Sequence, residues 1–262
     1  MSATTTTLPA PPPCTSAECS DGLITTRDDQ GRCYVERCPC YAVRKLYEFR
    51  GRRGFPLYPV PPTLADFEPG WGAKRAGRTE QSRAAYLGGR WLDSYARGVG
   101  AYVWGRTGSG KTRFATALAN DLCLRGGHMP MMVCLQTDIP ETGYSATEWW
   151  KLRAQIQKAK ILIVDNLRAD LSDYRTGQCA KLVEEFTRSR RSVLFTSTLD
   201  PRQLQGSGAW GDVASRIGEL CGRWQICLGA EDFRKPDSER RAPAPRKPPS
   251  GRDRAANQGH DD

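Results

Sequence analysis

The chain has 262 residues, which is enough for one well-buried domain and a smaller unit beside it. Hydrophobic residues make up 39% of it and its mean hydropathy is −0.59, so parts of the chain have little to bury. No apolar run approaches the ~20 residues of a membrane span, and the N-terminus lacks the basic-then-apolar pattern of a secretory signal, which excludes a membrane protein and predicts a cytoplasmic one.

The formal net charge is +10 and the isoelectric point is about 9.2. Arginine supplies most of this charge, and its guanidinium group pairs with phosphate in a bidentate fork. The excess of basic residues therefore favours a polyanionic partner such as nucleic acid. A genome that prefers arginine codons would give the same composition, so this alternative stays open.

Both ends of the chain are rich in Pro, Ser, Thr or charged residues and carry almost nothing to bury. We expect residues 1–13 to form a disordered tail and residues 235–262 to form a disordered basic tail.

Five of the ten cysteines crowd between positions 14 and 40, in a stretch with too few apolar residues for a core. Structural zinc takes four thiolate or imidazole ligands in a closed tetrahedron. The spacing C-x4-C…C-x-C therefore predicts a zinc-binding module over residues 14–41 in a reducing cytosol. More thiols are present than the four that one zinc ion needs: Cys14, Cys19, Cys33, Cys38 and Cys40. The alternative is that these cysteines bind no metal and lie in a loose tail.

The sequence pattern predicts a helix followed by a linker over residues 42–62. The segment 41–50 has an apolar side formed by Val43, Leu46, Tyr47 and Phe49. The segment 51–62 contains too much Gly and Pro for regular structure.

A larger domain is predicted over residues 63–234, where short apolar runs alternate with helical patterns. The expected strands are rich in β-branched residues, as strands buried on both faces are: Ala101–Trp104, Met131–Leu135, Ile161–Asp165, Ser192–Ser197 and Trp224–Leu228. A helix is expected over Thr112–Leu124, ended by Gly126-Gly127. This alternation predicts an α/β fold, with a five-stranded parallel sheet covered by helices on both faces.

A phosphate-binding loop follows the first of these strands and precedes the helix. It matches G-x-x-x-x-G-K-[ST] in full, as Gly105, Arg106, Thr107, Gly108, Ser109, Gly110, Lys111 and Thr112. Its glycines let backbone N–H groups turn toward a phosphate at the helix N-terminus. We expect Lys111 to reach the β- and γ-phosphates of ATP and the Thr112 hydroxyl to ligate Mg²⁺.

A second acidic site is predicted at Asp165, which ends an apolar strand some fifty residues after the phosphate loop. In α/β sheets ligands bind beyond the carboxyl ends of the strands, so Asp165 is expected in the Mg²⁺ shell. Related ATPases place Glu or Asp next, to activate the attacking water. Here the residue is Asn166, which has no basic form and could only position that water.

Together these motifs resemble bacterial or phage replicative helicase loaders of the DnaC/DnaI type, which are AAA+ ATPases related to IstB-like proteins. The resemblance covers roughly residues 14–234 and includes the cysteine module. Four further segments carry it: Thr63-Leu-Ala-Asp-Phe67, Ser197-Thr198-Leu199, Ser215-Arg216-Ile217 and Gly229-Ala-Glu-Asp-Phe-Arg234.

The resemblance implies an AAA+ core, assembly into an open spiral with ATP between subunits, single-stranded DNA in the channel and a hexameric replicative helicase as partner. It implies Cys14, Cys19, Cys38 and Cys40 as the zinc ligands, with Cys33 in place of Cys14 as the alternative. Thr198 falls at the sensor-1 position, where the family has Asn, and Arg216 falls at the arginine finger that acts on a neighbour's ATP. Asn166 and Thr198 both depart from the catalytic pattern, which implies a slow ATPase.

Two rival functions remain open. The first is an IstB-like transposition ATPase, and the second is a nucleotide-gated DNA- or partner-binding protein that hardly hydrolyses ATP. Two segments are candidate DNA contacts, although both could serve only in packing or face water: Glu148–Arg153, which contains Trp149 and Trp150, and the cations Arg188, Arg190 and Arg191.

Overall fold

The computed structural model describes residues 11, 13–49, 54–56, 58, 60–67, 78–126, 130–141 and 146–229. The C-terminal tail, almost all of the N-terminal tail and the Gly229–Arg234 motif beyond Gly229 lie outside these residues. In the described residues, no helix is long and apolar enough to cross a membrane.

The first elements in chain order are β1 (Cys19–Ser20), β2 (Leu23–Arg27), β3 (Cys33–Arg37) and α1 (Cys40–Phe49). Next come the 3-10 turn η1 (Leu64–Phe67), α2 (Arg78–Leu92) and the 3-10 turn η2 (Tyr95–Arg97). The rest consists of β4 (Ala101–Trp104), α3 (Lys111–Gly126), β5 (Met131–Cys134), α4 (Ala146–Lys158), β6 (Ile161–Leu167), α5 (Asp173–Arg188), β7 (Ser192–Ser197), α6 (Pro201–Gly206), η3 (Gly208–Trp210), α7 (Gly211–Cys221) and β8 (Gln225–Cys227).

The large sheet has five strands in the order β5-β6-β7-β4-β8, and every pair is parallel. This confirms the predicted five-stranded parallel sheet. One boundary differs in a way that matters for the site. Strand β6 does not end at Asp165 but continues to Leu167 through a bulge after Val164, because Leu167 still pairs with Ser197 of β7.

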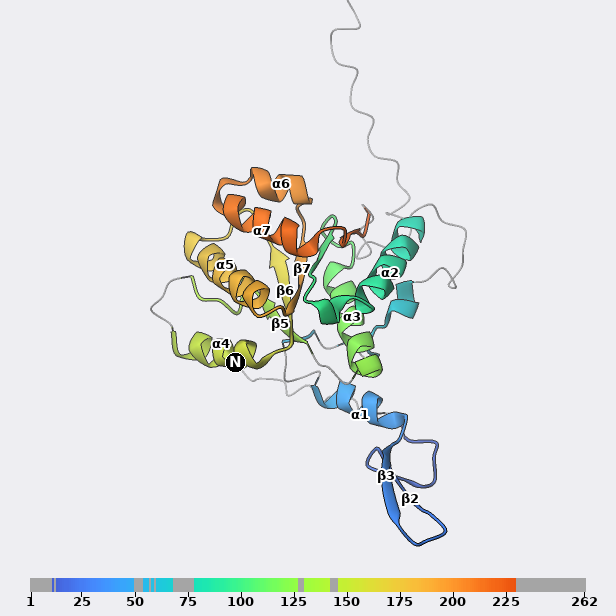
Figure 1. Ribbon diagram of the computed structural model, residues 1–262. Coiled ribbons are helices and arrows are strands. Elements are labelled where there is room, and N and C mark those ends of the chain that lie inside the picture. Colours follow the sequence, from blue (N-terminus) through green and yellow to red (C-terminus); the bar gives the residue numbers. More distant parts are fainter. Residues whose placement is uncertain are drawn as a thin grey trace, which may run out of the picture.

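Helices cover both faces of this sheet, as predicted (Figure 1). Successive strand residues point to opposite faces, so Tyr102 joins one buried cluster while Ala101 and Val103 join the other. Helices α2 and α3 pack on the second face, and α4, α5 and α7 pack on the first. Each face therefore has its own apolar core.

The cysteine-rich segment forms a small antiparallel sheet, β1-β2-β3, which sequence patterning did not predict. Its strands are largely exposed and lack alternating apolar residues, so the periodicity signal is absent. Helix α1 lies between this sheet and the core in Figure 1. It packs on α3, where the Cys123 thiol lies 4.0 Å from the carbonyl oxygen of Ala42.

The predicted linker has no helix or strand among its described residues before η1, yet it packs firmly. We call the described residues 54–56, 58 and 60–62 the strap. Phe55 is buried in the core, and the carbonyl oxygen of Pro62 accepts a hydrogen bond from Asn120 of α3 at 2.6 Å. Gly54 has a φ of 77° and lies so close to the Met132 carbonyl that a Cβ would collide with it. The strap therefore follows edge strand β5 and helix α3.

Candidate functional site

The predicted phosphate loop joins the end of β4 to the start of α3. Gly108 and Gly110 have φ angles of 82° and 87°, in the left-handed region that favours glycine. The Lys111 ammonium folds back over the loop and donates hydrogen bonds to the carbonyl oxygens of Gly105 at 3.0 Å and Arg106 at 2.8 Å. Ser109 is fully buried beneath the loop. The result is a tight turn that ends at a helix N-terminus, where an anion is stabilised.

Asp165 lies directly opposite the loop. The Thr112 hydroxyl is 3.1 Å from both of its carboxylate oxygens, and the Thr196 hydroxyl donates to Oδ1 at 2.6 Å. Burial raises the pKa of Asp165, while the two hydroxyls and the charge of Lys111 act in the opposite direction. A buried carboxylate beside a threonine hydroxyl is an all-oxygen donor set, which fits Mg²⁺.

These groups surround one cavity of about 680 Å³. Of the residues predicted for ATP and Mg²⁺, it brings together Thr107, Gly108, Gly110, Lys111, Thr112, Asp165, Asn166 and Thr198. Sequence reasoning missed Tyr58, Arg113, Cys134, Arg168 and Thr196, which also line it. Cys134 belongs to the strand predicted over Met131–Leu135, but it ends β5 and lines the cavity. Thr196 could have been found from the sequence, since it is a polar residue next to Ser197 at the carboxyl end of a predicted buried strand.

Asn166 occupies the bulge of β6 with a φ of 66°, a left-handed conformation that asparagine tolerates better than most residues. Its backbone N–H donates to the Thr196 hydroxyl at 2.9 Å, and its side-chain Nδ2 donates to Gln136 Oε1 at 3.2 Å. The amide therefore faces the cavity in a held orientation but offers no base.

The two remaining predicted catalytic residues lie in different places. Thr198 follows β7, is exposed and lines the cavity. Arg216 lies on α7 and does not line it; its Nη1 is 3.7 Å from Glu184 Oε2 on α5, with both side chains about half exposed. Within one chain Arg216 therefore pairs with α5 and does not reach the cavity.

The four cysteines implied as zinc ligands converge. The Sγ atoms of Cys14, Cys19, Cys38 and Cys40 all lie within 4.8 Å of one another, and the Cys14–Cys38 and Cys19–Cys40 distances are 3.4 Å. Tetrahedral zinc with Zn–S bonds of about 2.3 Å needs sulfurs about 3.8 Å apart. These sulfurs therefore fit one zinc ion, whereas Cys33 is exposed within β3 and is not in the group.

Local backbone geometry brings these thiols together. Cys38 directly follows β3, and its N–H donates to the carbonyl oxygen of Gly22 at 2.8 Å, while Cys40 opens α1. The Ser16 N–H donates to the Cys14 thiol and lowers its pKa to about 7. Burial and the neighbouring sulfurs raise the pKa of Cys40 to about 12. A cation bound among them offsets this mutual repulsion when all four ionise.

The two tryptophans among the candidate DNA contacts differ in burial. Trp149 is buried in the core, whereas Trp150 on the same helix is 59% exposed. Of these two tryptophans, Trp150 is therefore the one that a partner can contact.

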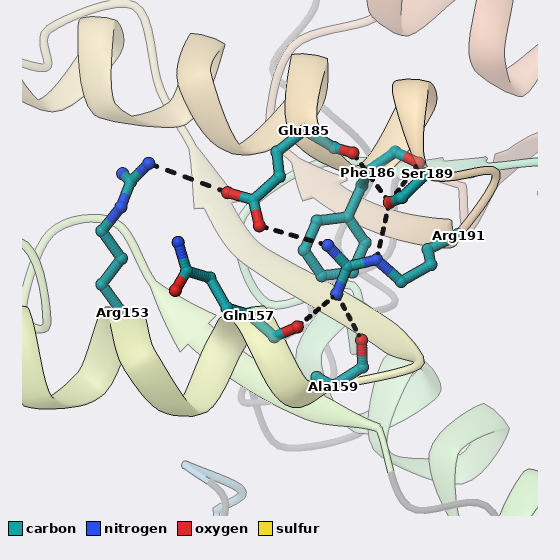
Figure 2. A network of polar contacts seen from close by, with 7 residues as sticks. All are labelled: Arg153, Gln157, Ala159, Glu185, Phe186, Ser189 and Arg191. Atoms are coloured by element: carbon teal, nitrogen blue, oxygen red, sulfur yellow. Dashed lines mark hydrogen bonds and ion pairs between the residues drawn. The ribbon is translucent and has the colours of Figure 1, made fainter.

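Arg191 belongs to the packing rather than to an open surface (Figure 2). Its Nη1 donates to the carbonyl oxygens of Gln157 and Ala159 at 2.8 Å, and its guanidinium lies 3.9 Å from the centre of the Phe186 ring. It also pairs with Glu185 at 3.2 Å. Arg191 thus joins the ends of α4 and α5 at the start of β7.

Comparisons with known proteins find a likeness in structure. No protein-family model and no curated protein matches the sequence. A solved DnaC helicase loader matches with a TM-score of 0.52 and 18% identity over 64% of this chain and 96% of that one. DnaI matches with a TM-score of 0.50 and 24% identity over 64% and 90%. A candidate primosome component from Streptococcus pyogenes serotype M3 matches with a TM-score of 0.50 and 19% identity over 64% and 87%.

At these identities the likeness is one of fold. The chain has a fold similar to that of the solved DnaC helicase loader and DnaI, with a four-cysteine cluster preceding it. The resemblance and the fold class predicted from the sequence are confirmed at that level.

Proposed function

We propose that this protein is a cytosolic ATP-dependent loader that places a hexameric replicative helicase on single-stranded DNA. The observation that carries the proposal is the convergence of Lys111, Thr112 and Asp165 around one cavity at the carboxyl end of an AAA+ sheet. The likeness to the DnaC helicase loader over nearly that protein's whole length supports the choice of reaction.

Each residue at the site has a role in this proposal. The backbone of Gly105–Gly110 cradles the β-phosphate, and Lys111 leaves the loop carbonyls to bind the β- and γ-phosphates. Thr112 and Asp165 would hold Mg²⁺, and the bound ion would neutralise charge on the phosphates. Thr198 contacts the γ-phosphate side, and Arg216 reaches the ATP of a neighbouring subunit in an open spiral.

The N-terminal module contacts the partner in this proposal. We assign residues 14–41 to a zinc module with Cys14, Cys19, Cys38 and Cys40 as ligands, and residues 63–234 to the ATPase domain. The module projects from the core below α1 in Figure 1, where a partner can approach its sheet.

The direct test is a capture experiment with purified protein, ATP and two candidate partners. A replicative helicase should bind to the natural chain, whereas a transposase should not. The reverse result would favour the IstB-like alternative.

Lys111→Ala should abolish ATP binding while leaving the melting temperature of the nucleotide-free protein unchanged. Normal ATP binding and turnover by this variant would overturn the phosphate-site assignment.

One observation favours a second function, namely nucleotide-gated binding with little hydrolysis. Asn166 stands where a water-activating carboxylate is expected; its side-chain amide donates to Gln136 and its backbone N–H donates to Thr196. Measuring ATP affinity and ATP turnover separately decides between the two. Tight binding with turnover no faster than that of Lys111→Ala would favour the gated binding protein.

A further inference from the structure

The strap brings one side chain, Tyr58, to the wall of the nucleotide cavity. Tyr58 comes from outside the AAA+ core, yet it lines the same cavity as Thr112, Arg113 and Asp165. None of the phosphate-loop motifs includes it, so its position is a property of how the strap packs.

The strap is anchored on both sides of Tyr58. Before it, Phe55 is buried in the core and Gly54 lies against the Met132 carbonyl of β5. After it, the Pro62 carbonyl accepts from Asn120, and the Leu64 N–H donates to the Asp121 carboxylate at 3.1 Å. These contacts hold the strap along α3, the helix whose N-terminus forms the phosphate site.

The surroundings of Tyr58 suit a hydrogen-bond donor to an anion. Burial raises the pKa of its phenol, and the nearby Asp165 carboxylate acts in the same direction, whereas Arg113 and the Thr116 hydroxyl oppose it. The hydroxyl therefore keeps its proton at neutral pH and can donate it. It lies on the side of the cavity where Thr112 and Asp165 are placed to hold Mg²⁺.

We propose that Tyr58 is a nucleotide-binding residue whose hydroxyl donates a hydrogen bond to the phosphate group of the bound nucleotide. This inference rests on the proposed ATP site.

The test is the affinity of the full chain for a fluorescent ATP analogue with Mg²⁺. Tyr58→Phe keeps the ring and removes only the hydroxyl, so it should weaken binding roughly tenfold, as expected for loss of a hydrogen bond to a charged group. Tyr86→Phe is the matched control, because Tyr86 is 67% exposed on α2, and it should bind like the natural chain.

A second measurement separates binding from packing. The melting temperature of nucleotide-free Tyr58→Phe should equal that of the natural chain, while its rise on adding ATP and Mg²⁺ should be smaller. Equal ATP affinities of Tyr58→Phe and the natural chain would overturn the inference. A lower melting temperature of nucleotide-free Tyr58→Phe than of the nucleotide-free natural chain would also overturn it. Failure of the natural chain itself to bind ATP would instead overturn the proposed function. The two outcomes are distinguishable, because the first compares Tyr58→Phe with the natural chain and the second concerns the natural chain alone.

Discussion

The Thr112 hydroxyl and the Asp165 carboxylate, 53 residues apart in sequence, meet at 3.1 Å with both carboxylate oxygens equally distant. Thr112 belongs to the first turn of α3 and Asp165 to β6, so only the parallel sheet brings them together. The carboxylate is 8% exposed and carries its charge close to the core. Such an arrangement costs stability until a cation is bound, and this gives the first prediction.

Asp165→Asn should raise the melting temperature of the nucleotide-free protein at neutral pH and abolish Mg²⁺-dependent ATP binding. Because burial raises the pKa of Asp165, the folded chain binds a proton here at pH values where the unfolded chain has lost it. Stability therefore falls as pH rises through this window, and the advantage of the variant should shrink on acidification. Melting curves across pH check this, with exposed Asp212→Asn as control; a pH-independent difference would contradict it.

The sulfur cluster predicts about one zinc per chain in freshly reduced protein. Changing Cys38 and Cys40 together to Ser should release the metal without unfolding the ATPase domain, since the cluster lies outside the five-stranded sheet, at the start of α1. Metal analysis with a circular dichroism melt measures both effects. Cys33→Ser should keep its zinc and Cys14→Ser should lose it; the reverse pattern would show that Cys33 is the fourth ligand.

Asn166→Asp should raise ATP turnover by at least about tenfold, because a positioned base typically contributes ~10²–10⁴ to a rate. Asn166→Glu should gain less, since aspartate tolerates the left-handed φ of 66° better than glutamate does. Steady-state turnover at saturating ATP measures this. If neither variant is faster, even with Thr198→Asn added, the account of slow hydrolysis fails.

Arg216→Ala should lower turnover and spare nucleotide affinity, because Arg216 does not line its own chain's cavity. An arginine supplied to a neighbour's γ-phosphate is worth ~10³-fold or more in other nucleotidases. Mixing Arg216→Ala chains with Lys111→Ala chains should restore part of the activity, since some interfaces then pair a sound phosphate loop with a sound arginine. A mixture no more active than the separate variants would mean that Arg216 does not act between subunits.

Arg191→Ala should destabilise the fold by about 2 kcal/mol, because it leaves the Gln157 and Ala159 carbonyls without a donor and exposes Phe186. The DNA affinity of the folded Arg191→Ala variant should differ little from that of the natural chain. Arg188→Ala is the control, since Arg188 is 80% exposed and its ion pair with Glu184 contributes under about 1 kcal/mol. Equal destabilisation by both variants, in a urea melt, would contradict this role.

The sequence predicted the AAA+ sheet because its strands are buried on both faces. Ala101–Trp104 and Ser192–Ser197 were predicted to the residue, since each is centred on a short apolar run of the kind found in strands buried on both faces. The phosphate loop and Asp165 could be located because their chemistry requires particular residue types at a particular spacing.

Contacts that depend on tertiary packing could not be predicted in this way. The strands of the cysteine module contain β-branched and aromatic residues, but they are exposed and show no alternation, so hydrophobic periodicity does not identify β2 or β3. Tyr58 lies in a Gly- and Pro-rich stretch whose path is set by contacts with β5 and α3. The bulge at Asn166 arises from pairing with β7, which no local pattern reports.

The most direct test of the central claim is retention of a replicative helicase on closed circular single-stranded DNA, on which a ring cannot thread from an end. With the natural chain and ATP, the helicase should remain bound to the circle after a high-salt wash. With Lys111→Ala, or without ATP, it should not. Helicase retained equally with and without this protein, or a natural chain that binds ATP and retains none, would contradict its role as a helicase loader.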